Sequence, residues 1–300
     1  MKSNARNPET SLLRLSRIGA VSTLTDLELE AALACPSGPG IRLSSRCGEA
    51  ELSLWISEAS WCTWLAPEIM APSLDQIDET LYPLLASWTL APLDEWLQAQ
   101  RLPALAQAKL ARDEAPPLCW RLTLSRAGLS LPLYLDDVPE ELLDLWLSAL
   151  SPNPARQHDF NLQLGWCQLP EARLSDLVLG EALPLNGLEE APDRFWLYPL
   201  AGGVRLQLLA ADLAQVVPAS PLLPPPEGTV RLRVEAGSIR LDAVTLADWS
   251  PGLEFTPQVH AYPGLRLMRD DRLWAEGTLL SLDDGWAVRL TTQPQHESMP

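Results

Sequence analysis

The sequence predicts an α+β N-terminal domain followed by two small β-rich domains. Three observations lead to this class. Helical and alternating apolar patterns both occur in the first 150 residues, a pattern of Gly and Leu recurs 72 residues later in the second half, and a proline-rich stretch separates the two copies. The expected boundaries are 1–152 for the N-terminal domain, 153–217 for the first β-rich domain, 218–228 for the linker, 229–293 for the second β-rich domain and 294–300 for a tail.

Two hairpins are expected in the N-terminal domain. The run 52–56 alternates apolar and polar residues, and 61–65 follows after a short break, which predicts the first hairpin. The runs 118–124 and 129–135 alternate around a turn at 125–128, which predicts the second.

Two helices are expected between and after these hairpins. Residues 73–76 have the spacing of a capping box, and the apolar residues after them fall on one helical face, although Pro83 interrupts that pattern. A second helix is expected to begin at 137–140, with an apolar side formed by Leu142, Leu143, Leu145, Trp146 and Leu150.

Seven of the 12 Trp residues lie in this domain. They fall on the apolar phases of their expected elements, which favours a role in the core. The alternative is a groove that binds a partner helix, since Trp is favoured in apolar interfaces with a polar rim. These residues are Trp55, Trp61, Trp64, Trp88, Trp96, Trp120 and Trp146.

The repeat in the second half has four fixed positions. Gly165, Leu169, Leu174 and Gly180 return as Gly237, Leu241, Leu246 and Gly252. Each copy is expected to contain a strand that ends in a glycine turn, a second short strand, one helical turn, and a Gly that reverses the chain. Further strands are expected in the second copy, at 265–268, 273–282 and 286–291. The first copy is expected to be shorter, with strands only at 195–200 and 204–209.

Each copy is too small to bury much surface alone. Two copies of about 65 residues would gain core by packing together, either within one chain or between two chains. The candidate residues for this pairing, or for a partner surface, are Leu169, Leu174, Val230, Leu232, Leu241, Leu246, Phe255, Trp274 and Trp286.

The linker is expected to act as a semi-rigid spacer. Residues 218–228 contain five prolines, which favour extended polyproline II over a helix or a central strand.

Composition argues against several functions. Twenty-two basic and 39 acidic residues give a net charge of −17, which disfavours nucleic acid and anionic lipid as partners. No apolar run approaches the roughly 20 residues that cross a bilayer, so direct membrane insertion is not expected. Five scattered Cys and three His predict neither a disulfide framework nor a metal site.

No catalytic or cofactor-binding residue is predicted. The chain lacks phosphate-loop and GxSxG patterns. Two acidic pairs, 270–271 and 283–284, are interpreted as turns, and Cys167 as a buried structural residue. We therefore expect a protein that is not an enzyme and holds no cofactor or metal.

The second copy resembles a known family. The stretch from 229 to 292 contains the segments Thr229-Val-Arg-Leu-Arg-Val, Pro251-Gly-Leu-Glu-Phe, Leu273-Trp-Ala-Glu-Gly-Thr-Leu and Val288-Arg-Leu-Thr. These segments resemble the surface-presentation-of-antigens (SPOA) domain of type III secretion and flagellar rotor ring proteins. The first copy resembles it less closely over 160–210, because no Pro precedes Gly180.

The resemblance implies a cytosolic ring (C-ring, or sorting-platform) protein of a type III secretion injectisome, related to flagellar motor switch proteins. It implies an intertwined β dimer module and a cytoplasmic location at the inner-membrane base of the apparatus, with a role in protein secretion and virulence. The partners it implies are the stator protein that regulates the ATPase, an accessory scaffold under the membrane ring, its own C-terminal fragment or other copies of itself, and chaperone–effector complexes.

Two alternatives remain. The first is a flagellar motor switch component, although the start of the chain offers no clear segment for binding a chemotaxis protein. The second is a phosphatase related to the flagellar switch family, although the chain lacks the paired E-x2-N motifs of those enzymes.

Overall fold

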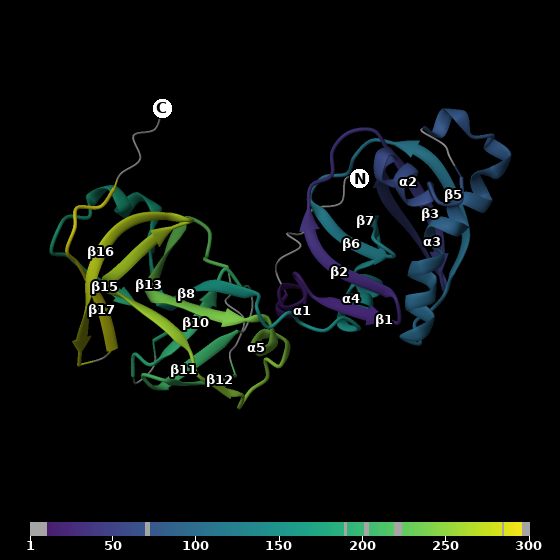
Figure 1. Ribbon diagram of the computed structural model, residues 1–300. Coiled ribbons are helices and arrows are strands. Elements are labelled where there is room, and N and C mark those ends of the chain that lie inside the picture. The colour runs from purple at the N-terminus through teal and green to yellow at the C-terminus, as the bar shows by residue number, and fades with distance from the viewer. Residues whose placement is uncertain are drawn as a thin grey trace. The chain divides into compact units, whose positions relative to one another are not determined.

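The computed structural model describes residues 11–69, 73–188, 191–200, 204–218, 224–283 and 285–295 (Figure 1). The chain forms two compact units, and each is considered by itself. Unit 1 consists mainly of Leu13–Arg156 and unit 2 mainly of Gln157–Pro300. The structure is rich in strands, which form one sheet in each unit, and has few helices.

Unit 1 contains a seven-stranded antiparallel sheet in the order β1-β2-β6-β7-β4-β3-β5. Its strands are β1 Val21–Leu24, β2 Leu27–Ala34, β3 Gly40–Cys47, β4 Ala50–Ser57, β5 Leu105–Asp113, β6 Cys119–Arg126 and β7 Leu129–Asp137. Its helices are α1 Leu12–Ser16, α2 Glu58–Leu65, α3 Tyr82–Ala99 and α4 Glu140–Ser148, with short 3-10 turns η1 Leu74–Gln76 and η2 Glu79–Leu81.

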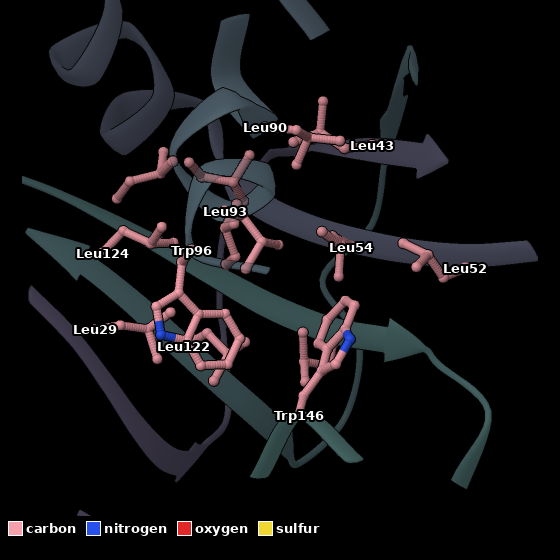
Figure 2. Close-up of a cluster of buried hydrophobic side chains, with 14 of the residues drawn as sticks. Leu29, Leu43, Leu52, Leu54, Leu90, Leu93, Trp96, Leu122, Leu124 and Trp146 are labelled. Carbon is pink, nitrogen blue, oxygen red and sulfur yellow. The ribbon is translucent and has the colours of Figure 1, made fainter. Parts of the chain in front are cut away.

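The core of unit 1 lies between the sheet and its long helices. Figure 2 shows Leu90, Leu93 and Trp96 of α3 and Trp146 of α4 among the leucines of the strands. Two buried indoles have hydrogen-bond partners: Trp61 Nε1 donates to Thr89 Oγ1 at 2.8 Å, and Trp96 Nε1 donates to Ser22 Oγ at 3.0 Å. Such partners matter because a buried donor without one costs free energy.

The core role expected for the tryptophans is confirmed for five of the seven. Trp55, Trp61, Trp96, Trp120 and Trp146 are buried. Trp64 is half-buried and the side chain of Trp88 is 46% exposed, so these two lie outside the core proper.

The expected strand at 61–65 is wrong, because this run belongs to helix α2. Ser57 caps the helix by accepting a hydrogen bond from Ser60 N at 3.2 Å, and Trp61 and Leu65 bury the inner face. Strand β4 forms its hairpin with β3 instead, in a register that runs from Gly40 opposite Ser57 to Cys47 opposite Ala50.

The expected capping box at 73–76 is also wrong. Ser73 makes no side-chain cap bond, and the chain passes through η1 and η2 before α3 begins at Tyr82. Pro83 therefore lies in the first turn of a helix, where proline is tolerated because its missing N–H has no intrahelical partner to lose.

The other hairpin and the last helix of unit 1 are confirmed. β6 and β7 pair from Arg126 opposite Leu129, across a turn in which Ala127 and Gly128 both have positive φ. Helix α4 buries Leu142, Leu143 and Trp146 but leaves Leu145 42% exposed, contrary to expectation.

Unit 2 contains a ten-stranded sheet in the order β14-β12-β11-β10-β8-β13-β15-β16-β17-β9. Its first repeat contributes β8 Gln157–Pro170, η3 Glu171–Asp176, β9 Ala182–Leu185, β10 Arg194–Tyr198, β11 Arg205–Ala210 and β12 Leu213–Val217. Its second repeat contributes β13 Thr229–Asp242, α5 Ala243–Ala247, β14 Glu254–Phe255, β15 Gln258–Arg269, β16 Arg272–Leu282 and β17 Gly285–Leu290.

The two repeats have the same order of elements. Each contains a long strand, one short helical turn, a short strand and three further strands. The expectation of an abbreviated first copy is therefore wrong, because β12 supplies the strand that the sequence pattern did not indicate. The three strands expected at the end of the second copy, and the turn at Asp270–Asp271, are confirmed.

The expected turns at Gly165 and Gly237 are wrong, because β8 and β13 run straight through them. These glycines instead allow close backbone approach: a Cβ on Gly165 would lie 2.3 Å from the Asn186 carbonyl oxygen, and one on Gly237 would lie 2.5 Å from that of His260. The expected reversals at Gly180 and Gly252 are confirmed by φ values of +92° and +93°.

The boundaries 153–217 and 229–293 stay predictions, and both segments lie in one unit. Part of the expected linker (219–223), Asp284 and most of the tail (296–300) lie outside the described residues. At the end of the linker, Gly228 accepts a hydrogen bond from Glu171 N at 3.1 Å.

Candidate interaction surfaces

The two repeats pair through their long strands. β8 and β13 are antiparallel from Thr229 opposite Pro170 to Asp242 opposite Gln157. Adding the 72-residue offset to one end pair gives the other, since Gln157 becomes Thr229 and Pro170 becomes Asp242. The pairing is therefore symmetric about a local twofold axis, and Glu235 opposite Gln163 is the pair beside it.

Each repeat also gives a strand to the other. β9 of the first repeat pairs with β17 of the second, with Leu185 opposite Trp286, and β14 of the second pairs with β12 of the first, with Phe255 opposite Ala214. Equivalent backbone bonds secure both exchanges. Gly180 N donates to Leu290 O at 3.0 Å and Gly252 N donates to Val216 O at 2.9 Å. The repeats are thus interlocked.

The structure brings most of the nine candidate pairing residues to the boundary between the repeats. Val230 lies opposite Leu169, Leu232 opposite Cys167 and Leu241 opposite His158, while Phe255 and Trp286 lie on the exchanged pairs. Leu174 and Leu246 are buried in the helical turns, and Trp274 is buried in β16. Contact of any of the nine with a second protein stays a prediction.

A polar cluster that we did not predict lies beside the axis. Glu235 is 1% exposed, and its Oε1 lies 2.7 Å from Arg233 Nε and accepts a bond from Asn161 Nδ2 at 3.2 Å. Gln163, opposite Glu235, is 4% exposed. Polar residues in otherwise apolar strands, at positions related by the repeat offset, were the available signal: Asn161 with Arg233, and Gln163 with Glu235.

The cluster extends outward through Tyr198. The Arg233 guanidinium lies 3.4 Å from the Tyr198 ring centroid, and Tyr198 donates to Asp271 Oδ1 at 2.6 Å. Burial, followed by the bond to Asp271, raises the pKa of Tyr198 above its ordinary value, so this hydroxyl stays protonated near neutral pH. The cluster can fix the position of the central strands.

Cys167 lies at the same boundary and is buried, as expected. Burial raises the pKa of its thiol to about 12. Because the thiolate is the reactive form, this side chain is suited to packing rather than to nucleophilic attack.

Searches for a metal centre and a membrane span gave no candidate in the described ranges. Among the residues the structure describes, no three His, Cys, Asp or Glu side chains gather as a metal site would require. No helix in the same part of the chain is long and apolar enough to cross a membrane.

Fold and site together define a β-rich protein in which an N-terminal α+β unit precedes a unit of two interlocked repeats. Residues 11–146 match the family model described as the SepQ protein N-terminal domain. This match points to a family of type III secretion sorting-platform proteins, and thus to a structural component in protein transport. The matched range lies within unit 1, and no curated protein matches the chain.

Proposed function

We propose that the chain is a non-enzymatic scaffold in the cytosolic ring, or sorting platform, of a type III secretion injectisome. The observation that carries this proposal is the match of residues 11–146 to the SepQ N-terminal domain. A scaffold role agrees with a structure whose best-built feature is a pairing of two repeats through 13 opposed residue pairs between β8 and β13.

We propose further that the two repeats are SPOA domains paired within one chain. Two features support this: the resemblance of 229–292 to that domain, and the reciprocal exchange of β9 and β14. An interlocked module of this kind offers a fixed surface to partners, because the exchanged strands hold both repeats in one arrangement.

The proposed partners are the stator protein that regulates the ATPase, an accessory scaffold under the membrane ring, other copies of the chain or its C-terminal fragment, and chaperone–effector complexes. The proposed location is the cytoplasmic face of the inner-membrane base of the apparatus.

An in-frame deletion in the source organism tests the function. We expect effector proteins to disappear from the culture supernatant while motility is unchanged, and we expect the full-length gene to restore secretion. Secretion that continues in the deletion strain would refute the proposal. Loss of motility with normal secretion would favour the flagellar alternative instead.

Two biochemical measurements separate the remaining alternatives. Co-purification of the tagged full chain with the stator protein tests the scaffold role, with a Gly237→Val variant as the control in which the crossing beside His260 is blocked. Turnover of an acyl-phosphate substrate above a buffer blank would favour the phosphatase alternative.

A further inference from the structure

Helix α3 exposes a line of apolar side chains. Leu84 is 47% exposed and Trp88 is 46% exposed, with the exposed Ala91 one turn further on and Leu81, 39% exposed, just before the helix. Spacings of three and four residues place them on one helical face. The opposite face carries Leu85, Leu90 and Leu93 into the core, so the exposed line is not needed to hold α3 in place.

An apolar groove lies beside this line. It has a volume of about 390 Å³ and is bounded by α2, α3 and the turn between β6 and β7. Its apolar lining includes Trp64, Pro67, Trp88, Pro92 and Leu129. The two tryptophans least buried in unit 1 thus share one surface feature, which agrees with the groove alternative for the Trp residues.

The rim of the groove is acidic. Glu68 and Glu95 border it together with Arg126, and Arg126 is shared between Glu95 Oε2 at 2.7 Å and Asp26 Oδ2 at 3.2 Å. The sequence around the groove has the same bias: the 54 residues between Arg46 and Arg101 contain nine Asp or Glu and no Lys or Arg. The charge complement of this rim is cationic.

We propose that this groove binds an amphipathic helix of a partner protein, with apolar side chains facing Trp64 and Trp88 and Lys or Arg on its flanks. The walls favour a helix over an extended peptide, since the groove lies on helices and a turn and presents no open strand edge for strand addition. From Leu81 to Glu95 the line spans about 21 Å at 1.5 Å per residue, which corresponds to about four turns of a bound helix. The inference rests on the proposed scaffold function, because it assumes that unit 1 docks a protein.

Binding of two synthetic peptides to the full chain tests this proposal. The first is a Leu/Lys amphipathic helix of about 15 residues, and the second has the same Leu positions with Glu in place of Lys. Fluorescence anisotropy of the labelled peptides at about 150 mM salt limits long-range attraction to the net negative protein. The variants are Trp64→Ala and Trp88→Ala, with Leu145→Ala as the matched control because Leu145 is an exposed apolar residue on α4 of the same unit. Circular dichroism melts check that each variant folds.

We expect the Lys peptide to bind, with affinity falling at least about tenfold in each Trp variant and unchanged in Leu145→Ala. We also expect the Glu peptide to bind at least about tenfold more weakly. Absence of Lys-peptide binding, equal binding by Trp88→Ala, or equal binding of both peptides would overturn the proposal. So would a wild-type dimer that Trp88→Ala converts to a monomer in light scattering, since the groove would then belong to a second copy. The deletion experiment above is independent of these peptides, so scaffold function and groove can fail separately.

Discussion

Replacing Gln163 with Glu places a second carboxylate opposite Glu235 beside the local twofold axis. The facing residues are 4% and 1% exposed, so water cannot screen the new charge. Both side chains lie on the same face of the strand pair, because Glu235 also bonds Asn161, two residues from Gln163. The variant therefore creates a buried pair of like charges at the centre of the interlocked repeats.

The expected loss of stability follows from this geometry. Opposed Cα atoms in an antiparallel pair are about 5 Å apart, and two unit charges at that distance repel by about 3.3 kcal/mol at an effective dielectric constant of about 20. Protonation limits the loss: neutralising a carboxyl with an ordinary pKa of about 4.3 costs about 3.7 kcal/mol at pH 7 and about 1 kcal/mol at pH 5. We expect unit 2 to lose about 3 kcal/mol at pH 7 and about 1 kcal/mol at pH 5.

The sign of this pH dependence can be checked by linkage. The pKa of the introduced carboxyl is raised in the folded state, so the folded variant binds more protons than the unfolded one above about pH 4.3. Stability of the variant relative to wild type therefore falls as the pH rises through neutrality.

Hydrogen exchange measured by mass spectrometry on the full chain gives the local readout. Peptides from β8 and β13 should exchange faster in Gln163→Glu, while peptides from β6 and β7 of unit 1 serve as the internal control. Gln163→Met, which adds no charge, should show no such pH dependence. Asn161→Arg combined with Gln163→Glu copies the Arg233–Glu235 pair into the first repeat and should recover part of the loss. Equal protection of wild type and Gln163→Glu at pH 7 would refute the reasoning.

Three further predictions follow from other parts of the chain. Gly237→Ala should destabilise unit 2 by about 1–3 kcal/mol, because the new Cβ meets the His260 carbonyl at 2.5 Å, whereas its neighbour variant Ser238→Ala should stay within about 0.5 kcal/mol in denaturant unfolding. Leu93→Ala should destabilise unit 1 by about 2–5 kcal/mol and the exposed Leu145→Ala by less than about 0.5 kcal/mol in calorimetry, so equal effects would contradict the assignment of the core. In the native chain at about pH 8, Cys167 should resist iodoacetamide while the exposed Cys35 reacts, because burial raises the Cys167 pKa to about 12; peptide mass mapping that finds both labelled at similar rates would contradict this.

Local signals accounted for the elements that the sequence predicted well. The β6–β7 hairpin has strict alternation on both strands and a short turn, and α4 has a helical period with Pro139 at its start. The run 61–65 was misassigned because a short apolar run is compatible with either a strand or a helix; Ser57 and Glu58 at its start were the available helix signals. β12 was missed because only Ala214 and Val216 of its five residues face the core.

The site depended on information that local patterns do not contain. The repeat predicted that two copies exist and that they gain by pairing, but it did not determine whether the pairing lies within one chain. It also led us to assign turns to Gly165 and Gly237, because a glycine that allows a turn and one that allows a close backbone crossing have the same sequence signature. Opposition of Gln163 and Glu235 depends on a register between strands 72 residues apart.

The exchange of β9 and β14 sets an order of events during synthesis. Leu185 pairs with Trp286, which the ribosome adds 101 residues later, or roughly 5–20 s at ordinary elongation rates. Until then β9 has no strand to join, and β8 waits in the same way for β13. The first repeat cannot finish folding on the strength of its own residues, so a nascent chain that stops before β17 keeps unpaired strand edges. Only a chain translated through the second repeat can complete the fold of the first.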